Sequence, residues 1–497
     1  MSVVMGVDSS TQSCTVTLHE SDTGALLGTA SAPHPPTAPP LSEQNPEAWW
    51  SALVEALPRA CERAGCKPSD IAALSIAAQH HGMVVLDRSD RILRPAKLWN
   101  DTTSFEYAHQ LISALGREEW ATRVGSVPNS SLTIAKVAWF AAREPELFAQ
   151  LSHLMLPHDW LTFQLTGLKT TDRADASGTG YFNLVDNRWR PDVLELVDST
   201  VDWELMLPVV MGPDQSAGFA DTARAAELGL DSRTLVGCGT GDQAAAALAL
   251  GTKPGDIVVS LGTSGTVYGQ SPFPVIDPTG FVEGAANATG GFQPIVVTLN
   301  AAKVTDTFGR LMGVNHEELS SLAIAADQSI RDRPLLASFL DTERSPDRPN
   351  SRGLLGGLSS TTSREELALA AFEGVVLGLH RGFVRLRELG VDASGRLLIT
   401  GGAAKSQGYQ RVIANIFSHA VSMSTTNGSL DSARGAAIQA AAVLRNATVA
   451  SVSHEWAPAT PVVVEPETRT SGFLEGLLER YERIADVEAL DGMWSIV

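Results

Sequence analysis

The chain has 497 residues, of which 44% are hydrophobic and 19% are charged. One hydrophobic core rarely extends over so many residues, so we expect two domains, at residues 1–245 and 246–497. The formal net charge of −19 argues against a general nucleic-acid or anionic-membrane surface. Four cysteines are too few for a disulfide scaffold, and neither a secretory leader nor a membrane-length apolar run is expected, which predicts a cytoplasmic protein.

The first predicted element is a β-hairpin at the start of the chain. An apolar run at 3–7 breaks at Asp8, and alternating apolar and polar residues resume at 14–18. The tip carries small hydroxyl residues, namely Ser9, Ser10 and Thr11. Small residues let the backbone approach a ligand, and converging N–H groups favour an anion such as phosphate. Asp8 ends a buried strand, where its carboxylate needs a partner: Mg²⁺, directly or through water, or an Asx turn in the hairpin.

A helix and a strand then lead to the first candidate ligand residues. Asn45 followed by proline predicts a helix from there through Arg63. Residues 71–78 predict a buried strand with 83–86 as its partner. The connection between these strands is polar and contains Gln79, His80 and His81. Neighbouring histidines on a strand point to opposite faces, so we expect at most one of them to contact a ligand. A sugar hydroxyl would be a suitable hydrogen-bond partner for that imidazole.

The next stretch mixes predicted helices with polar loops. An aromatic platform with two polar groups, which suits a sugar, is formed by Trp99, Asn100 and Asp101. A turn after a strand is the alternative interpretation of these three residues. Helices are expected at 131–140 and 144–154, followed by a long polar loop at 171–180.

The strongest single motif joins a strand to a helix through a glycine-rich loop at 237–241. Asp242 follows this loop at the start of an alanine-rich helix that runs to Leu250. The positive end of a helix dipole keeps a carboxylate ionised, and an ionised Asp beside a hydroxyl can accept its proton during phosphoryl transfer. A plain N-cap aspartate is the alternative. Neither the Rossmann nor the P-loop pattern occurs in the sequence.

A second hairpin lies about half a chain after the first. The apolar run at 257–261 breaks into a tip of four small residues: Gly262, Thr263, Ser264 and Gly265. Two such tips could hold a polyphosphate between them, and the repeat indicates a duplicated α/β chain. Later, a long helix is predicted at 364–389, and a strand at 396–400 breaks before a helix at 410–417. The residues in that break could seat a nucleoside, or form an ordinary turn: Gly401, Gly402, Ala403 and Ser406.

Taken in order, these segments resemble the FGGY carbohydrate kinases, and within that family the xylulokinase branch. The resemblance covers nearly the whole chain, and eight motifs in family order are highly specific. They are GVDSSTQS at 6–13, SEQNPEAWW at 42–50, QHHG at 79–82, LWND at 98–101, DASGTG at 175–180, GCGTGDQAA at 237–245, SLGTSGT at 260–266 and TGGAAKS at 400–406.

The resemblance implies an α/β fold of two ribonuclease-H-like, actin-type ATPase domains with a cleft between them. It implies a sugar kinase that uses ATP and Mg²⁺ to phosphorylate the terminal hydroxyl of a ketopentose, with D-xylulose expected. Asp242 would be the catalytic base and Asp8 the Mg²⁺-associated acid, while His80 and His81 would contact the sugar. The two hairpin tips would face the phosphates, and 401–403 the nucleoside. A homodimer is expected, as is a last set of helices that packs back on the first domain.

Two positions depart from the family pattern. Thr15 stands where many relatives have lysine, and His80 stands where xylulokinases often have Met or Gln. Two alternatives therefore stay open at this point. One is a kinase for another ketose or pentitol, such as ribulose, xylitol or arabitol. The other is a nucleotide-gated, actin-like binding protein without sugar chemistry.

Overall fold

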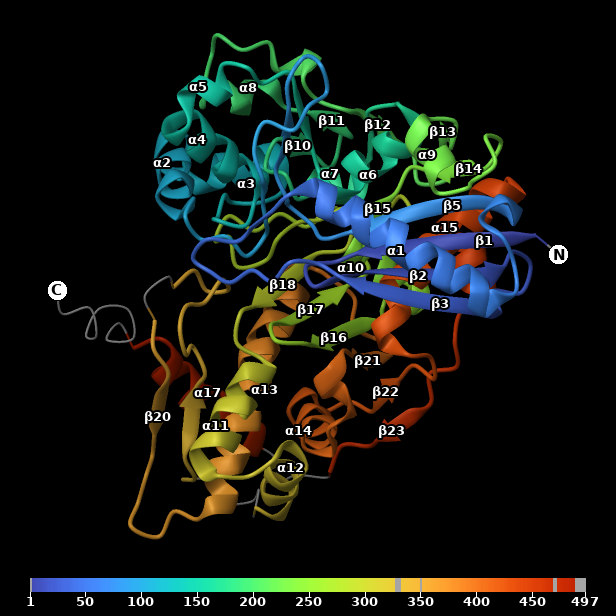
Figure 1. Ribbon diagram of the computed structural model, residues 1–497. Helices are drawn as coiled ribbons and strands as arrows, with labels where there is room; N and C mark the ends of the chain where they lie inside the picture. The colour runs from blue at the N-terminus through green and yellow to red at the C-terminus, as the bar shows by residue number, and fades with distance from the viewer. Residues whose placement is uncertain (1, 327–331, 349–350, 468–471, 488–497) are drawn as a thin grey trace.

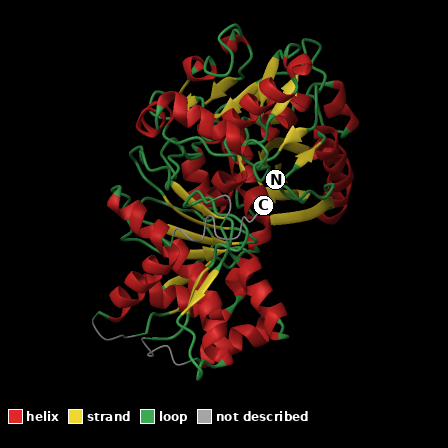
Figure 2. Cartoon of the chain, turned by 90° about the vertical axis from the view of Figure 1, so that its left-hand side faces the viewer, coloured by secondary structure: helices red, strands yellow, loops and turns green. Residues whose placement is uncertain are grey.

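The computed structural model describes every residue except 1, 327–331, 349–350, 468–471 and 488–497. Two β-sheets dominate the two halves of the chain, with helices flanking the strands of both (Figures 1 and 2). The N-terminal sheet has the order β13 (Ser216–Phe219), β14 (Leu235–Gly237), β5 (Ile71–Ala78), β1 (Val3–Ser9), β2 (Ser13–Glu20) and β3 (Leu26–Pro33), and β15 (Thr240–Gly241) also pairs with β5. The C-terminal sheet has the order β23 (Val462–Val464), β22 (Val421–Met423), β21 (Leu397–Thr400), β16 (Ile257–Leu261), β17 (Gly265–Gly269) and β18 (Ile295–Thr298).

The two sheets repeat one topology, strand for strand. Each begins with a hairpin, β1–β2 or β16–β17, and a third antiparallel strand follows on the far side of it. The first strand of each hairpin pairs in parallel with a later strand, β5 or β21, and that strand pairs in parallel with the next, β14 or β22. An antiparallel strand closes each edge. Both predicted hairpins are confirmed, and the repeated order supports a duplicated α/β chain.

The N-terminal sheet is covered on both faces. Successive residues of a strand point to opposite faces, so Met5 packs with α1 (Pro46–Ala64) while Val4 packs with α15 (Asp431–Arg445). The helix α1 begins as predicted, because the Asn45 side chain accepts a hydrogen bond from the Glu47 amide. Figure 1 shows α15, a late element of the chain, beside β1 and β5. A C-terminal helix thus completes the N-terminal domain.

The helix α10 (Asp242–Ala249) lies between the two halves and packs against α15. A Cβ on Gly435 of α15 would lie 1.8 Å from the carbonyl oxygen of Ala245, so the two helix backbones are in direct contact there. The predicted domain boundary after residue 245 falls inside α10. The following helix, α16 (Val449–Glu455), also contacts α10 and α15.

The core of the C-terminal half surrounds α13 (Arg364–Glu388), which starts at a capping box formed by Ser363 and Glu366. This helix is long and apolar enough to cross a membrane by length and composition, but 72% of its most apolar window is buried inside the structure. Around it lie α11 (Ala302–Met312), α12 (His316–Ala325), α14 (Gln407–Phe417), α17 (Phe473–Ala485) and the small pair β19 (Leu335–Ala337) and β20 (Leu354–Gly356).

A further set of helices and short strands extends the N-terminal domain away from the C-terminal half (Figure 1). It comprises α2 (Phe105–Leu115), α3 (Arg117–Val124), α4 (Thr133–Arg143), α5 (Pro145–Phe148), α6 (Pro157–Thr166), α7 (Arg173–Ser177), α8 (Pro191–Leu194), α9 (Ala223–Glu227), β4 (Glu43–Gln44), β6 (Val84–Leu86), β7 (Ala96–Lys97), β8 (His153–Met155), β9 (Thr170–Asp172), β10 (Phe182–Asn183), β11 (Arg188–Trp189) and β12 (Val209–Met211).

Three local predictions in this extension are wrong. Residues 83–86 pair with β8 instead of 71–78, since a distant strand supplies the hydrogen bonds. Residues 144–154 form only the short α5 before β8, because the same strand pairing takes the end of the segment. The segment 171–180 contains β9 and α7, because Asp172 caps α7 by accepting hydrogen bonds from the amides of Ala174 and Asp175.

Candidate active site

Asp242 occupies the first position of α10, directly after the glycine-rich loop, as predicted. Protein side chains lie directly against the glycines of this loop. A Cβ on Gly239 would lie 2.8 Å from Nδ1 of His158, and one on Gly241 would lie 1.8 Å from Cε1 of His80. Any larger residue at these positions would displace an imidazole ring, that of His158 or that of His80. The glycines therefore shape the inner wall of the site.

His80 lies between two carboxylates. Its Nδ1 is 2.7 Å from Oδ1 of Asp175, whose side chain is fully buried, and its Nε2 is 3.8 Å from Oδ1 of Asp242. Burial alone would disfavour the charged ring, but the charge and hydrogen bond of Asp175, with the charges of Asp242 and Asp172, raise the pKa of His80 to about 9. His80 is consequently an imidazolium at neutral pH, with one N–H directed at each carboxylate.

His81 has the opposite electrostatic character. Its Nδ1 donates a hydrogen bond to the carbonyl of Gly178 at 2.6 Å, and its backbone φ is 63°. Burial, together with the positive charges of His80, Arg344 and Lys136, holds the pKa of His81 well below its usual range. The ring is thus neutral, and because Nδ1 carries the proton, Nε2 is free to accept a hydrogen bond.

The expectation that only one of these histidines meets a ligand assumed that both lie in a strand. The strand β5 ends at Ala78, and the two rings lie side by side with their centroids 5.4 Å apart. Both side chains therefore lie in the same region of the site. What distinguishes them is their protonation state.

Asp8, at the first hairpin tip, interacts electrostatically with Asp242. Oδ1 of Asp8 accepts a hydrogen bond from the hydroxyl of Ser10 at 2.6 Å. Burial and the negative charge of Asp242 raise the pKa of Asp8 to about 7, against the lowering effect of Ser10. A buried carboxylate whose proton affinity is raised by a second negative charge is a natural place for a cation. The hydroxyl of Ser9 is buried and has no hydrogen-bond partner within the described chain.

Thr11 connects the hairpin tip to the predicted sugar-facing residues. Its Oγ1 accepts a hydrogen bond from Nε1 of Trp99 at 2.9 Å and donates one to Oε1 of Gln79 at 3.2 Å. Nε2 of Gln79 is buried and makes no hydrogen bond to any residue that the structure describes. Thr11 therefore orients two side chains from different elements and leaves one amide donor of Gln79 available.

Asn100 and Asp101 differ in their availability. Oδ1 of Asn100 is buried without a hydrogen-bond partner among the described residues. Asp101, by contrast, is fully buried, and its oxygens accept hydrogen bonds from the amides of Ser42 and Thr103 and pair with Lys97 at 3.1 Å. Asn100 thus has a free acceptor for a ligand, while the carboxylate of Asp101 holds the surrounding loops together.

The second hairpin tip borders a pocket of about 730 Å³ in the C-terminal half. Five of the predicted phosphate- and nucleotide-binding residues line it: Gly262, Thr263, Gly402, Ala403 and Ser406. Asp306, Glu317 and Tyr409 line it as well. The other six predicted residues are not among its lining residues: Ser9, Ser10, Thr11, Ser264, Gly265 and Gly401. Gly401 instead allows close packing of β21 on β16, because a Cβ there would lie 2.4 Å from the carbonyl oxygen of Leu261.

The surroundings of Asp8 suit Mg²⁺. Mg²⁺ usually binds through one or two carboxylates, keeps several waters and takes phosphate oxygens from its substrate. Asp8 supplies hard oxygen donors, and burial together with the negative charge of Asp242 raises its pKa, so a cation would stabilise its ionised form. Within the described residues, no cluster of three or more His, Cys, Asp or Glu side chains is placed to hold a metal ion by itself. The residues fit a metal that shares its ligands with a phosphate.

Sequence reasoning missed Asp175 and the buried charges behind it. His158 is fully buried, and its Nε2 lies 3.2 Å from Asp159, 3.4 Å from Asp172 and 3.5 Å from Asp175. Burial raises the pKa of Asp159 well above its usual range and raises that of Asp172. The signal was present in the DASGTG motif, whose aspartate is the partner of His80.

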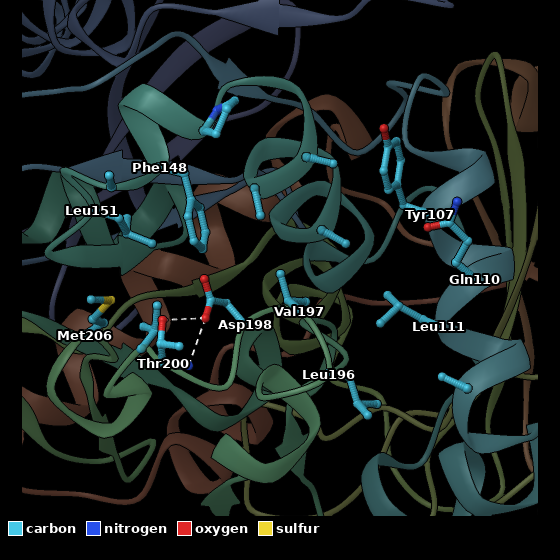
Figure 3. A pocket seen from close by; sticks show the side chains of 17 residues that line it. Tyr107, Gln110, Leu111, Phe148, Leu151, Leu196, Val197, Asp198, Thr200 and Met206 are labelled. Carbon is cyan, nitrogen blue, oxygen red and sulfur yellow. Dashed lines mark hydrogen bonds between the residues drawn. The ribbon is translucent and has the colours of Figure 1, made fainter.

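A second pocket, of about 680 Å³, lies in the extension of the N-terminal domain (Figure 3). Its wall is mostly apolar, with Phe148, Leu151 and Val197 directed into it. The carboxylate of Asp198 on its edge accepts hydrogen bonds from the amide and hydroxyl of Thr200. None of the predicted site residues lines this pocket.

Comparisons with known proteins agree with this architecture. Residues 3–249 match the model of the N-terminal domain of the FGGY family of carbohydrate kinases, and residues 257–444 match that of its C-terminal domain. The chain is 39% identical to a xylulose kinase of Streptomyces rubiginosus, over 96% of this chain and 95% of that protein. It is 31% identical to the xylulose kinase of Escherichia coli K12, over 82% of each.

The crystal structure of a xylulose kinase from Bifidobacterium adolescentis has a TM-score of 0.84 and 33% identity, and the match covers 96% of this chain and 99% of that one. A ligand-bound xylulose kinase from Lactobacillus acidophilus shares the fold with a TM-score of 0.91 at 21% identity, covering the whole of both chains. The predicted actin-type α/β fold is confirmed. The chain belongs to the FGGY family of carbohydrate kinases.

Proposed function

We propose that this protein is an ATP-dependent xylulose kinase, which transfers the γ-phosphoryl group to the terminal hydroxyl of D-xylulose and releases D-xylulose 5-phosphate and ADP. The observation that carries the proposal is the placement of Asp242 at the N-terminus of α10, with its carboxylate beside His80 and in the field of Asp8. The similarity to xylulose kinases over nearly the whole chain supports the choice of sugar.

The acceptor site is built from side chains of the N-terminal domain that retain a free polar group. The neutral Nε2 of His81 and Oδ1 of Asn100 can accept hydrogen bonds from sugar hydroxyls, and Nε2 of Gln79 can donate one. Trp99, fixed by Thr11, supplies an aromatic surface for the carbon face of the sugar. Asp101 supports this wall from behind through its bonds to the surrounding loops.

The chemical step requires little covalent chemistry from the protein. Asp242 accepts the proton of the terminal hydroxyl as that oxygen bonds to the γ-phosphorus. The bond from phosphorus to the bridging oxygen breaks, and its electron pair leaves with ADP. The positive end of α10 favours the ionised form of this carboxylate. Catalysis then rests on alignment of the hydroxyl with the phosphate and on exclusion of competing water.

ATP is assigned to the space between the two hairpin tips and to the C-terminal pocket. The adenosine would lie in the 730 Å³ pocket against residues 402–406, and the phosphates would extend past Thr263 toward Ser9 and Ser10. Mg²⁺, when bound, neutralises charge on the phosphate oxygens. Asp8 would hold it, directly or through water.

A coupled ADP-release assay over a panel of acceptors tests the function directly. We expect kcat/KM for D-xylulose to exceed that for D-ribulose, xylitol and arabitol by at least about tenfold, equivalent to about 1.4 kcal/mol. A larger kcat/KM for one of the other acceptors would identify that compound as the substrate instead. Rapid ATP hydrolysis that does not respond to any sugar would favour the nucleotide-gated binding protein. The proposal also includes a cytoplasmic location and a homodimer. Analytical ultracentrifugation tests whether the protein is a dimer.

A further inference from the structure

The ring of His80 is held by residues that come from two separate parts of the chain. Asp175 fixes Nδ1 at 2.7 Å, and Gly241 leaves the space that the ring fills, since a Cβ there would lie 1.8 Å from Cε1 and 2.3 Å from Nε2. The remaining nitrogen, Nε2, faces Oδ1 of Asp242 at 3.8 Å. The ring therefore has one hydrogen-bonded edge, one face against backbone and one edge directed at the assigned catalytic base.

We propose that His80 is a positioning residue for Asp242: clamped by Asp175, it holds the carboxylate in place and keeps it charged until the sugar hydroxyl delivers its proton. This inference rests on the proposed function, and it reassigns His80 from the sugar wall to the base. The sugar wall keeps His81, whose neutral Nε2 is free.

The charges around His80 support this role. The groups that face it are Asp175 and Asp172 from the β9–α7 segment, Asp242 from α10, His158 from α6 and the neighbouring His81. Three of these are carboxylates, so the imidazolium is strongly favoured and cannot readily accept a proton from Asp242. His80 is thus not a relay for the substrate proton.

Asp242 needs such a partner because its surroundings oppose its charge. Burial raises the pKa of Asp242, and the carboxylate of Asp175 raises it further, whereas the charge of His80 lowers it. A protonated Asp242 could not accept the hydroxyl proton. Without His80, a larger fraction of the enzyme would therefore carry an inactive base at neutral pH.

The test is the pH dependence of D-xylulose phosphorylation by His80→Gln. Glutamine keeps a hydrogen bond to Asp175 but carries no charge. We expect the acidic limb of the kcat profile to move to higher pH by about one unit or more, because an opposite charge at this distance shifts a carboxyl pKa by about 1–3. The KM for D-xylulose should change less than about threefold, which is less than 1 kcal/mol.

His81→Gln is the matched control, since it changes the adjacent histidine that is assigned to the sugar. This variant should raise the KM for D-xylulose and leave the acidic limb in place. If His80→Gln behaves in the same way, His80 contacts the sugar and the inference is overturned. Failure of the wild-type enzyme to phosphorylate D-xylulose would instead overturn the proposed function.

Two further variants keep the inference testable if His80→Gln does not fold. Asp175→Asn removes the carboxylate that fixes the ring, so kcat should fall; because the charge of Asp175 itself raises the pKa of Asp242, the acidic limb should move less than it does in His80→Gln. In an Asp242→Asn background, the residual kcat should respond to Asp175→Asn by much less than it does in the wild type, because the two changes act on the same base. Full additivity of the two effects would contradict the proposal.

Discussion

Gly6 of β1 lies directly against the carbonyl oxygen of Ala433 in α15, where a Cβ would approach to 1.8 Å. The same Cβ would lie 2.5 Å from the amide nitrogen of Ala437. The strand that carries Asp8 is thus positioned by a helix from the far end of the chain. Because that helix also contacts α10, which carries Asp242, one packing arrangement places both carboxylates.

Gly6→Ala should destabilise the protein by about 1–3 kcal/mol, since overpacking of this size forces backbone to move. Chemical denaturation followed by circular dichroism measures the change. Gly476→Ala in α17 is the control, because a Cβ there meets no described atom within 4 Å. That variant should change stability by no more than about 1 kcal/mol, and toward greater stability. Equal stability of wild type and Gly6→Ala would contradict the close packing.

Asp242→Asn should lower kcat about 10²–10⁴-fold, the usual range for loss of a general base, while the protein stays folded. Steady-state ADP release measures kcat, and thermal unfolding checks the fold. Asp198→Asn, at the edge of the second pocket, is a matched change away from the site and should keep kcat within about twofold of wild type. Near-wild-type turnover by Asp242→Asn would end its assignment as the base.

Asp8→Asn should stabilise the Mg²⁺-free protein, and more strongly at pH 8 than at pH 5. The folded-state pKa of Asp8, about 7, lies above that of an ordinary Asp, so the wild type loses stability as pH rises toward 7 and Asp8 ionises in a buried site. Asparagine does not ionise, so the gain can reach about 4 kcal/mol above pH 7, at about 1.4 kcal/mol per pKa unit. The gain should vanish below about pH 4.

Melting temperatures in buffers with a chelator, over pH 4 to 9, test this prediction. The kcat of Asp8→Asn should fall, because the carboxylate whose ionisation destabilises the folded protein is also the one assigned to Mg²⁺. A stability difference that does not depend on pH would show that Asp8 is already ionised in the folded protein below pH 7.

Gly402→Leu should raise the KM for ATP at least about tenfold, which corresponds to about 1.4 kcal/mol of lost binding. A Cβ at Gly402 meets no described atom within 4 Å, and this residue lines the pocket of about 730 Å³, so the side chain of a leucine there can extend into the pocket. The KM for D-xylulose should change little. Initial rates with each substrate varied in turn separate the two constants.

Gly401→Leu is the contrasting variant for the nucleotide pocket. This glycine has a φ of 89° and would place its Cβ 2.4 Å from the carbonyl oxygen of Leu261, so the expected result is loss of stability. An unchanged KM for ATP in a folded Gly402→Leu protein would remove the pocket from the nucleotide site.

Much of the fold could be predicted from local patterns, which depend on residues that are close together in the sequence. Both hairpins, the capped start of α1 and the placement of Asp242 at a helix start could be predicted, because alternation, turns and caps depend on residues a few positions apart. The pairing of β6 with β8 could not, since a strand does not specify its partner. Nor could the bonds of Asp101 to Ser42 and Lys97, because these partners approach it only in the folded chain.

By itself, the sequence determined two phosphate-prone hairpin tips, a repeated α/β plan and an aspartate at the start of α10. Only the tertiary structure decided which residues of these parts contact one another. It brought Asp175 to His80 across 95 positions and Thr11 to Trp99 across 88, and it inserted α15 behind β1. The protonation states of His80 and His81 depend on those neighbours, because burial and nearby charge set a pKa and neither can be seen in a local pattern.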